Sequence, residues 1–497
     1  MTNAQSDDVF PRAYGNEFES AIMLATKGDD GEWCPVPEHR VPQELFRHIP
    51  YQPPRMVRLY DPSGGFLANG YRTYIDDTHL EFCTPETVSP SAATAATRGT
   101  ELLIEQTVRR YLTKNNDPVH RVARLQKRVV DSSGVRWASH DNFDVSALLA
   151  DRLETPDSPE RRALLVYLMT RSVICGAGFV SPSGMHFAQK IDGLATISGH
   201  SHDGSMFRTE RESDVVGRAR LELRCGDANV SDWATWMRFG SAALLLGLLQ
   251  MGEAVYLDKD GLLSTERKAP KLATLHNLVS ADGDYELTAG RIKSSLDFQR
   301  RIAETALRCL PAVTDASSEY RQVAEELLAF CDDVKRVRRR GAEVLSLADR
   351  ADWPIKLHAI QTAFALNPRL ASRHPVSARA ALAEVVDRRY DETYLESYRG
   401  EIVDERYGWG LRRRDQGAYR LQVPQKRAEA FSRFPEPGTR AAIRAQLLSD
   451  YEVSECDWGR LDLLAAGSRQ VRISLPDVRQ SQLDKVQQNL LSGSVAY

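Results

Sequence analysis

The chain has 497 residues, of which 42% are hydrophobic and 27% charged, with a formal net charge of −3 at pH 7. This length exceeds a single simple core and predicts two domains, or one large domain with an appendage. The near-neutral charge excludes a strongly basic nucleic-acid-binding protein, so we expect no nucleic-acid partner.

The cysteines and apolar segments indicate where the protein resides. Seven cysteines are scattered along the chain without a CxxC pair. This pattern argues against a disulfide framework or a thiolate zinc site and is typical of a reducing compartment. The N-terminus lacks the apolar region of a secretory signal. The apolar run Ser241–Met251 is too short to span a bilayer. We therefore expect a cytoplasmic protein without membrane association.

In chain order, a short tail leads into a predicted strand that ends near Ser20. Residues 24–56 are rich in Gly, Pro and charge and predict a long loop or a partly ordered insertion. Residues 71–82 alternate like a strand, and residues 101–115 have helical spacing. Two strand-like runs within residues 120–145 flank a DSSG turn and predict a hairpin.

The second half of the chain is predicted to be mainly helical. Helices are predicted at residues 158–176, 231–251, 295–348 and 352–394, and a strand at 219–225. The segment from residue 425 to the C-terminus predicts a small α+β module.

The strand at residues 71–82 carries unusual chemistry. Arg72, Tyr74 and Asp76 occupy alternate positions, so they share one face of the strand. Such a face can bind Mg2+ through oxygens, or place a carboxylate base beside a phosphate-binding arginine. A solvated strand with mixed polar residues is the simpler alternative.

Other polar residues leave two interpretations open. Glu17 and Glu19 also alternate; alone they indicate a solvated edge strand, but with Asp76 and Glu81 they are compatible with a metal-binding cradle. His140-Asp141-Asn142 could bind a metal or form a turn. Candidate phosphate-binding arginines, each of which could equally be a surface residue, are Arg208, Arg211 and Arg220.

Several short blocks occur together, in order, along most of the chain. They are Gly15–Glu19, Arg72–Asp76, Glu81–Glu86, Ser139–Phe143, Thr170–Gly178, Gly226–Asn229, Asp352–Lys356, Asp387–Asp391 and Asp457–Trp458. In these blocks the chain resembles the family of Pup ligases and Pup deamidases/depupylases, where Pup is a small, disordered prokaryotic ubiquitin-like protein. The resemblance implies an α+β fold, with a glutamine synthetase-like domain at 1–424 and a small α+β domain at 425–497. The large domain would contain a curved antiparallel β-sheet cradle packed by helices.

The resemblance also implies roles for individual residues. Asp76 would be catalytic, and the residues at the Mg2+ site would be Glu17, Tyr74 and Glu81. Arg72 and Thr84 would contact ATP, or ADP plus phosphate, and Trp458 would pack on adenine. We add His140 as a candidate metal ligand, and Arg208 and Arg220 as candidate cofactor-binding residues.

Family members either couple Pup to a lysine with consumption of ATP, or hydrolyse that bond with bound nucleotide as cofactor. The spacing of Asp76, His79 and Glu81, and Ser139 in place of a cysteine, resemble the hydrolase branch. We predict a monomeric depupylase that acts on Pup and pupylated proteins. An ATP-dependent Pup ligase and a non-catalytic Pup-binding paralogue stay open as alternatives.

The chain also departs from the family pattern. Residues 20–70 are shorter than the insertion of the hydrolases, and Glu222 stands where family members tend to have histidine. Asp141 replaces a glutamate, so a possible metal ligand would be shorter.

Overall fold

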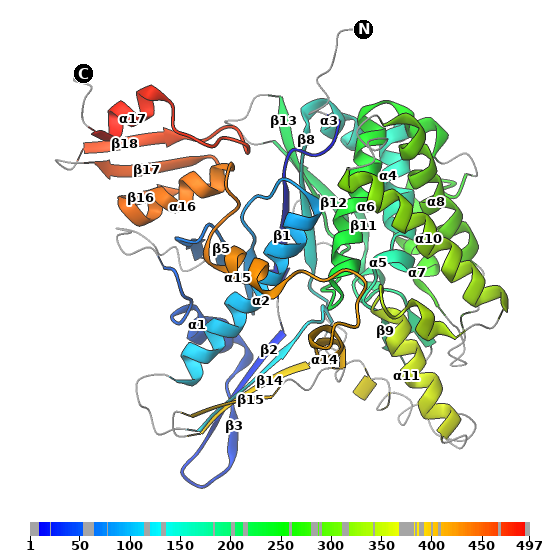
Figure 1. The fold of residues 1–497 in the computed structure, drawn as a ribbon, viewed down its shortest axis with the longest axis horizontal. Helices are drawn as coiled ribbons and strands as arrows, with labels where there is room; N and C mark the ends of the chain where they lie inside the picture. Colours follow the sequence, from blue (N-terminus) through cyan, green and yellow to red (C-terminus); the bar gives the residue numbers. More distant parts are fainter. Residues whose placement is uncertain are drawn as a thin grey trace.

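The structure is a computed structural model and describes residues 9–492. The residues not described within this span are 20, 53–63, 77, 114–119, 131–135, 182–183, 200–203, 212–216, 258–260, 280–286, 288–290, 311–317, 341–342, 367–381, 383–384, 387–391, 399–400, 406–408 and 466–468. Figure 1 shows a central sheet with helices beside it, a second sheet below, and a small C-terminal sheet at the upper left. The predicted block Asp387–Asp391 lies outside the described residues.

The central sheet has eight strands in the order β11-β12-β13-β8-β1-β6-β5-β4. Their bounds are β1 Tyr14–Glu19, β4 Gly64–Phe66, β5 Arg72–Asp76, β6 His79–Cys83, β8 Ser139–Ser146, β11 Thr196–Ser198, β12 Ser205–Glu210 and β13 Arg218–Leu223. Neighbouring strands pair antiparallel, except the parallel pair β11 and β12. The prediction of a single strand at residues 71–82 is wrong, because β5 and β6 are two strands that pair antiparallel with each other. The predicted strand at residues 219–225 corresponds to β13 of the same sheet.

The two faces of this sheet differ in chemistry. Phe18, Phe82 and Phe143 alternate with polar residues and are buried in the core. Because side chains alternate along a strand, Glu17 and His140 point to the opposite face. Apolar burial on one side therefore presents a row of ionisable side chains on the other.

A second sheet has the order β15-β14-β7-β2-β3. Its strands are β2 Ala21–Lys27, β3 Trp33–Pro35, β7 Arg121–Gln126, β14 Glu392–Tyr398 and β15 Glu401–Glu405. The predicted hairpin at residues 120–145 is wrong, because β7 pairs with β2 and β14 whereas β8 joins the central sheet. Of the expected pairing, the described residues show one isolated bridge, between Val130 and Arg136.

Residues 24–56 contain more regular structure than the predicted loop. β2 and β3 form a hairpin, and helix α1 (Val41–Phe46) follows. Leu24 and Leu45 are buried in an apolar cluster with residues of β6. The Gly, Pro and charged residues thus mark the turns of a compact segment.

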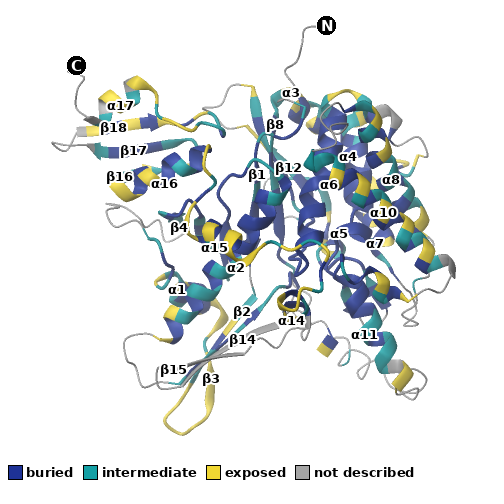
Figure 2. Cartoon of the chain, in the orientation of Figure 1, coloured by how far each residue is buried: buried dark blue, intermediate teal, exposed yellow. Residues whose placement is uncertain are grey.

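The helices between β4 and the C-terminal segment pack on the sheets or on one another. They are α2 Pro90–Leu112, α3 Ala147–Glu154, α4 Pro159–Thr170, α5 Ser172–Cys175, α6 Asp232–Gln250, α7 Ala269–Asn277, α8 Ile292–Cys309, α10 Glu319–Arg340, α11 Trp353–Leu366 and α14 Trp409–Asp415, and a small hairpin is formed by β9 Phe179–Ser181 and β10 Gly184–His186. Figure 2 shows α6 buried in the interior. Among the described helices, none is both long and apolar enough to cross a membrane.

Helix α2 begins earlier than its predicted start at residue 101. Its first half consists largely of small residues, so the sequence there shows little of the apolar periodicity by which a helix is predicted. These residues allow close packing of a later helix: a Cβ atom added at Gly99 would lie 3.0 Å from the backbone nitrogen of Ser432. The small side chains of α2 therefore allow another helix to pack closely against it.

The C-terminal segment contains α15 Gln425–Arg433, α16 Arg440–Asp450, β16 Glu452–Cys456, β17 Arg460–Ala465, β18 Arg469–Ser474 and α17 Lys485–Ser492. The strands form a sheet in the order β16-β17-β18. Leu447, Leu461 and Ile473 form an apolar cluster that also contains Phe66 of β4. The domain boundary between residues 424 and 425 stays a prediction.

Asp141 lies beneath the central sheet. It is fully buried and forms ion pairs with Arg171 at 3.1 Å and Arg238 at 2.8 Å. Asp141 follows His140 in β8, so it points away from the ionisable face. The idea that Asp141 is a shortened metal ligand is therefore wrong.

We predict that Asp141→Asn lowers the free energy of unfolding by about 3–5 kcal/mol, because it leaves two buried guanidinium groups without their carboxylate. Urea denaturation measures this change. The control Glu304→Gln removes a more exposed pair with Arg300 and should cost at most about 1 kcal/mol. Equal denaturation midpoints for the two variants would contradict this account.

Candidate active site

The predicted site residues lie on neighbouring strands of the central sheet. Glu17 of β1 lies opposite Cys83 of β6 on one side and His140 of β8 on the other. Tyr74 of β5 lies opposite Glu81. Residues directly opposite each other point to the same face of a sheet. The predicted residues gathered on this face are Glu17, Arg72, Tyr74, Asp76, Glu81 and His140.

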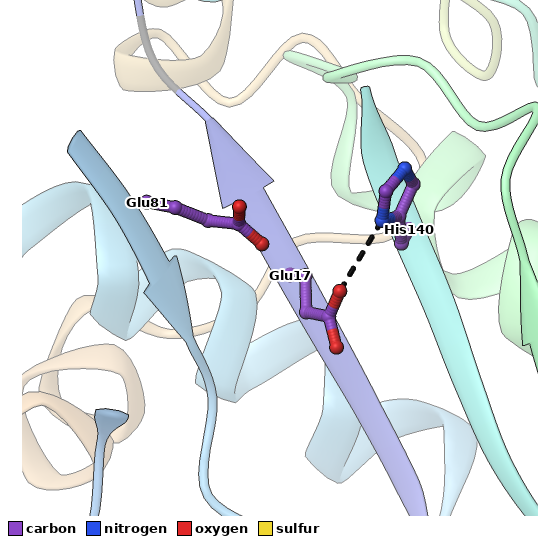
Figure 3. Close-up of side chains that lie close together, drawn as sticks. All are labelled: Glu17, Glu81 and His140. Atoms are coloured by element: carbon purple, nitrogen blue, oxygen red, sulfur yellow. Dashed lines mark hydrogen bonds and ion pairs between the residues drawn. The ribbon is translucent and has the colours of Figure 1, made fainter. Parts of the chain in front are cut away.

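A first cluster centres on Glu17 (Figure 3). Ligand atoms of Glu17, Glu81 and His140 lie within 4.8 Å of one another. Nδ1 of His140 donates to Oε2 of Glu17 at 3.2 Å, and Nη1 of Arg220 donates to Oε1 at 2.9 Å. Glu17 is thus held from two sides by cationic groups.

These neighbours control the protonation of the first cluster. Burial raises the pKa of Glu17, but the hydrogen bond from His140 and the charge of Arg220 outweigh burial and lower it to about 2. Burial lowers the pKa of His140, but its bonds to Glu17 and to Glu222, at 3.0 Å, raise it to about 10. His140 is therefore an imidazolium at neutral pH, and it would have to lose a proton before it could bind a metal.

Glu81 is compensated less fully, by the charge of His140 and a hydrogen bond with Tyr74. It is only 2% exposed, and its Oε1 accepts no hydrogen bond from the described residues. Burial and the charges of Glu17 and Glu19 raise the pKa of Glu81 well above its usual range. A divalent cation beside Glu81 and Glu17 would supply the missing charge, and Mg2+ prefers oxygen ligands. The residues therefore fit the predicted Mg2+, which would neutralise phosphate charge when bound.

Glu19, Asp76 and Glu81 form a second cluster, with carboxylate oxygens within 4.8 Å of one another. Burial raises the pKa of Glu19, the charge of His140 lowers it and that of Asp76 raises it, with a result of about 6. Nδ1 of His79 lies 4.0 Å from Oε2 of Glu19. The alternation of Glu17 and Glu19 had left open a metal-binding cradle with Asp76 and Glu81, and the structure places Glu19 beside those two carboxylates.

Arg72 and Tyr74 extend the site across β5. Burial, followed by the charges of Cys83 and Glu81, raises the pKa of Tyr74, so its phenol is neutral. The guanidinium of Arg72 lies 4.8 Å from the Tyr74 ring centroid, and its charge helps to lower the pKa of Glu17. Arg72 therefore places a positive charge near Glu17.

A cavity of about 740 Å³ opens beside the first cluster towards the C-terminal strands. Four predicted residues line it: Glu17, Thr84, Arg220 and Trp458. The backbone N–H of Asn16 donates to Oγ1 of Thr84 at 2.9 Å, which fixes that hydroxyl.

The candidate arginines do not all lie at this cavity. Arg220 lines it and contacts Glu17. Arg208 lies on β12 and pairs with Glu210 at 3.2 Å, away from the cavity lining. Arg211 is exposed and pairs with Asp151. The structure thus brings Arg220, but neither Arg208 nor Arg211, to the cavity.

Ser139, one of the two hydrolase-like features, lies on the opposite face from Glu17. It is buried, and its Oγ accepts a hydrogen bond from Nδ2 of Asn16 at 2.9 Å. Ser139 can therefore influence the site through packing and hydrogen bonding, but not by contact with reactants.

A second cavity, open to solvent, spans about 1430 Å³ including its mouth. It is lined by residues of β2, β7 and α1, and by His79 and Leu80 at the start of β6. Arg124 and Arg128 contribute basic side chains to its lining. The two cavities thus lie at opposite ends of β6, with the carboxylate clusters between them.

A family model described as Pup-ligase protein matches residues 32–462. The chain belongs to the Pup-ligase family. Its relatives within this family carry two names. A Pup deamidase/depupylase of Mycobacterium tuberculosis is 25% identical, covering 82% of this chain and 76% of the relative. A Pup–protein ligase of Micrococcus luteus is 27% identical, covering 93% of this chain and 94% of the relative.

Solved structures of the family share the fold. The complex between Pup and its ligase PafA matches with a TM-score of 0.72 and 19% identity, over 98% of this chain and 93% of that chain. The Pup ligase PafA in complex with ADP matches with a TM-score of 0.61 and 18% identity, over 92% of this chain and 94% of that chain. The predicted α+β fold, with its antiparallel sheet cradle, is confirmed.

We predict that Glu17→Gln and Glu81→Gln each weaken Mn2+ binding at least about tenfold, because each removes a charged oxygen ligand. Electron paramagnetic resonance of free Mn2+ measures the affinity. Asp144→Asn is a matched control, since Asp144 lies on the same sheet face but pairs with Arg218 and belongs to neither carboxylate cluster. Unchanged affinity in both glutamate variants would show that the cation binds elsewhere.

Proposed function

We propose that this chain is a depupylase-like hydrolase of the Pup system. It would cleave the isopeptide bond between the side chain of the C-terminal glutamate of Pup and a substrate lysine. Mg2+ and ATP, or ADP plus phosphate, would serve as bound cofactors. The observation that carries the proposal is the register of β5 and β6, in which Asp76 lies directly opposite His79. This geometry corresponds to the shorter spacing that resembles the bond-breaking branch.

Asp76 is well placed to act in hydrolysis. Its carboxylate lies beside those of Glu19 and Glu81, between the two cavities. It would act as nucleophile or activate water. In the net reaction the water oxygen bonds to the glutamate carbonyl carbon, the carbon–nitrogen bond breaks, and the lysine amine leaves with a proton. A cation at Glu17 and Glu81 would polarise the reacting centre.

The two cavities suggest separate places for nucleotide and protein. The cavity lined by Thr84, Arg220 and Trp458 would hold the nucleotide. The cavity lined by Arg124 and Arg128 would receive the acidic chain of Pup, because basic side chains complement acidic peptides. Arg124 and Arg128 are therefore the basic side chains that we assign to a groove for Pup. A disordered peptide bound along such a groove would become ordered on binding.

An ATP-dependent Pup ligase is the second candidate. Coverage favours it, because the alignment spans 94% of the Micrococcus luteus ligase but 76% of the Mycobacterium tuberculosis deamidase/depupylase. In that reaction Asp76 would act as a base towards the incoming lysine. A non-catalytic Pup-binding paralogue is disfavoured by the intact set Glu17, Asp76 and Glu81.

We predict that the protein releases free Pup from a pupylated substrate in the presence of Mg2+ and nucleotide, without net ATP turnover. Gel electrophoresis follows Pup release, and an ADP assay follows turnover. Asp76→Asn should reduce release by at least about 100-fold, the typical contribution of a positioned acid–base group. The exposed control Asp151→Asn should keep full activity.

New conjugates accompanied by ADP formation would establish the ligase instead. Binding of Pup without either reaction would support the non-catalytic paralogue. Full activity of Asp76→Asn would exclude its catalytic role.

A further inference from the structure

We propose that Glu86 is a positioning residue for the nucleobase, because it fixes Trp458 through Arg444. This inference rests on the proposed nucleotide-binding function of the 740 Å³ cavity. Glu86 follows β6 directly after Thr84 and Pro85, whereas Arg444 and Trp458 belong to the C-terminal segment. A single carboxylate would therefore connect the phosphate side of the site with the base side.

Glu86 is held by two arginines of α16. Nη2 of Arg444 donates to Oε2 of Glu86 at 2.7 Å, and Nε of Arg440 donates to Oε1 at 2.7 Å. Nη1 of Arg444 adds a bond to Oε1 at 3.2 Å. All three side chains are buried, and charge-assisted bonds of this bidentate kind are both strong and directional.

Glu86 is ionised at neutral pH. Burial raises its pKa, but the charges of Arg444 and Arg440 outweigh this and lower it to about 2. Because the pKa of Glu86 is lower in the folded state, its ionised form stabilises the fold at a pH above the ordinary pKa of glutamate. This contribution is lost as the pH falls from that ordinary value to about 2. The contact is therefore permanent at neutral pH.

Arg444 passes this constraint on to Trp458. Its Nη1 donates to the backbone oxygen of Trp458 at 2.8 Å. Its guanidinium lies 5.2 Å from the Trp458 ring centroid and 4.5 Å from that of Phe66. Phe66 of β4 meets the Trp458 ring edge to face at 4.9 Å and 88°. Backbone and ring of Trp458 are thus both fixed by groups that do not depend on a bound nucleotide.

One segment would therefore align three parts of the nucleotide site. Glu81 belongs to the carboxylate cluster that would bind the cation, Thr84 lines the cavity that would hold the phosphates, and Glu86 would fix the platform for the base. Glu86 also lines the cavity, so direct contact with nucleotide is the alternative. Both of its oxygens already accept hydrogen bonds from guanidinium groups, which favours positioning over contact.

The test compares a ligand that has a base with one that lacks it. Mg-ATP and Mg-triphosphate are titrated into the wild type and Glu86→Gln by calorimetry. We expect Glu86→Gln to weaken ATP about tenfold, since stacking on a base contributes on this order, and to leave triphosphate binding unchanged. In the depupylation assay, the KM for nucleotide should rise while kcat stays within about twofold, because uniform binding is what is lost.

Two further variants separate positioning from general damage. Arg444→Lys keeps a positive charge near Glu86 but cannot bridge it to the Trp458 backbone, so it should reproduce the selective loss of ATP binding. It also carries the test if Glu86→Gln does not fold. The control Asp462→Asn removes a bidentate pair with Arg472 within the same small sheet and should change neither ligand.

Equal weakening of ATP and triphosphate would overturn the inference, and so would unchanged binding of both by both variants. A wild type that binds neither ligand would remove the proposed nucleotide function itself. A wild type that binds ATP, with variants that behave like it, would remove only the role of Glu86.

Discussion

The register of β1 between β6 and β8 is the constraint on which the site depends. Glu17 lies opposite both Cys83 and His140. A shift by one residue would turn Glu17 into the core and bring Phe18 to the reactive face, because side chains alternate along a strand. Phe18 and Phe82 are almost fully buried, so hydrophobic packing on the far side of the sheet maintains the chemistry on the near side.

Charge is unevenly compensated across that face. Around Glu17, His140 and Arg220 provide cationic partners. Around Glu81, burial and the charges of Glu17 and Glu19 outweigh the charge of His140 and the hydrogen bond with Tyr74, so the pKa of Glu81 is raised. A cation bound there would favour the ionised form of Glu81 and release its proton. Binding of the metal would then be coupled to deprotonation of Glu81. This coupling would hold whether the reaction breaks or forms the isopeptide bond.

The sequence was most informative where alternation and local motifs decide the structure. Alternate residues placed Arg72, Tyr74 and Asp76 on one face, and the run at Ser241 marked the buried helix α6. Pairings between distant segments were less accessible. The run at Arg121–Gln126 resembles a partner for β8, yet it pairs with β2 and β14, and no local pattern distinguishes these choices.

The role of Glu86 was not predicted for the same reason: it depends on contacts between distant segments of the chain. Glu86 gains its role from Arg440 and Arg444, which lie more than 350 positions further along the chain, so no spacing rule could connect them. Ser139 shows the converse case: a residue beside a site motif in the sequence faces the other side of the sheet. Separation along the chain therefore predicts neither the contacts of Glu86 nor the face to which Ser139 points.

The central claim is that Glu17 and Glu81 together bind the cation of a Mg-nucleotide. Crystals grown with Mn2+ and ADP would test it most directly, through the anomalous signal of the metal. The account predicts a peak between the carboxylates of Glu17 and Glu81, with the base against Trp458. ADP in the cavity with no peak at these carboxylates, or a peak only elsewhere, would contradict it.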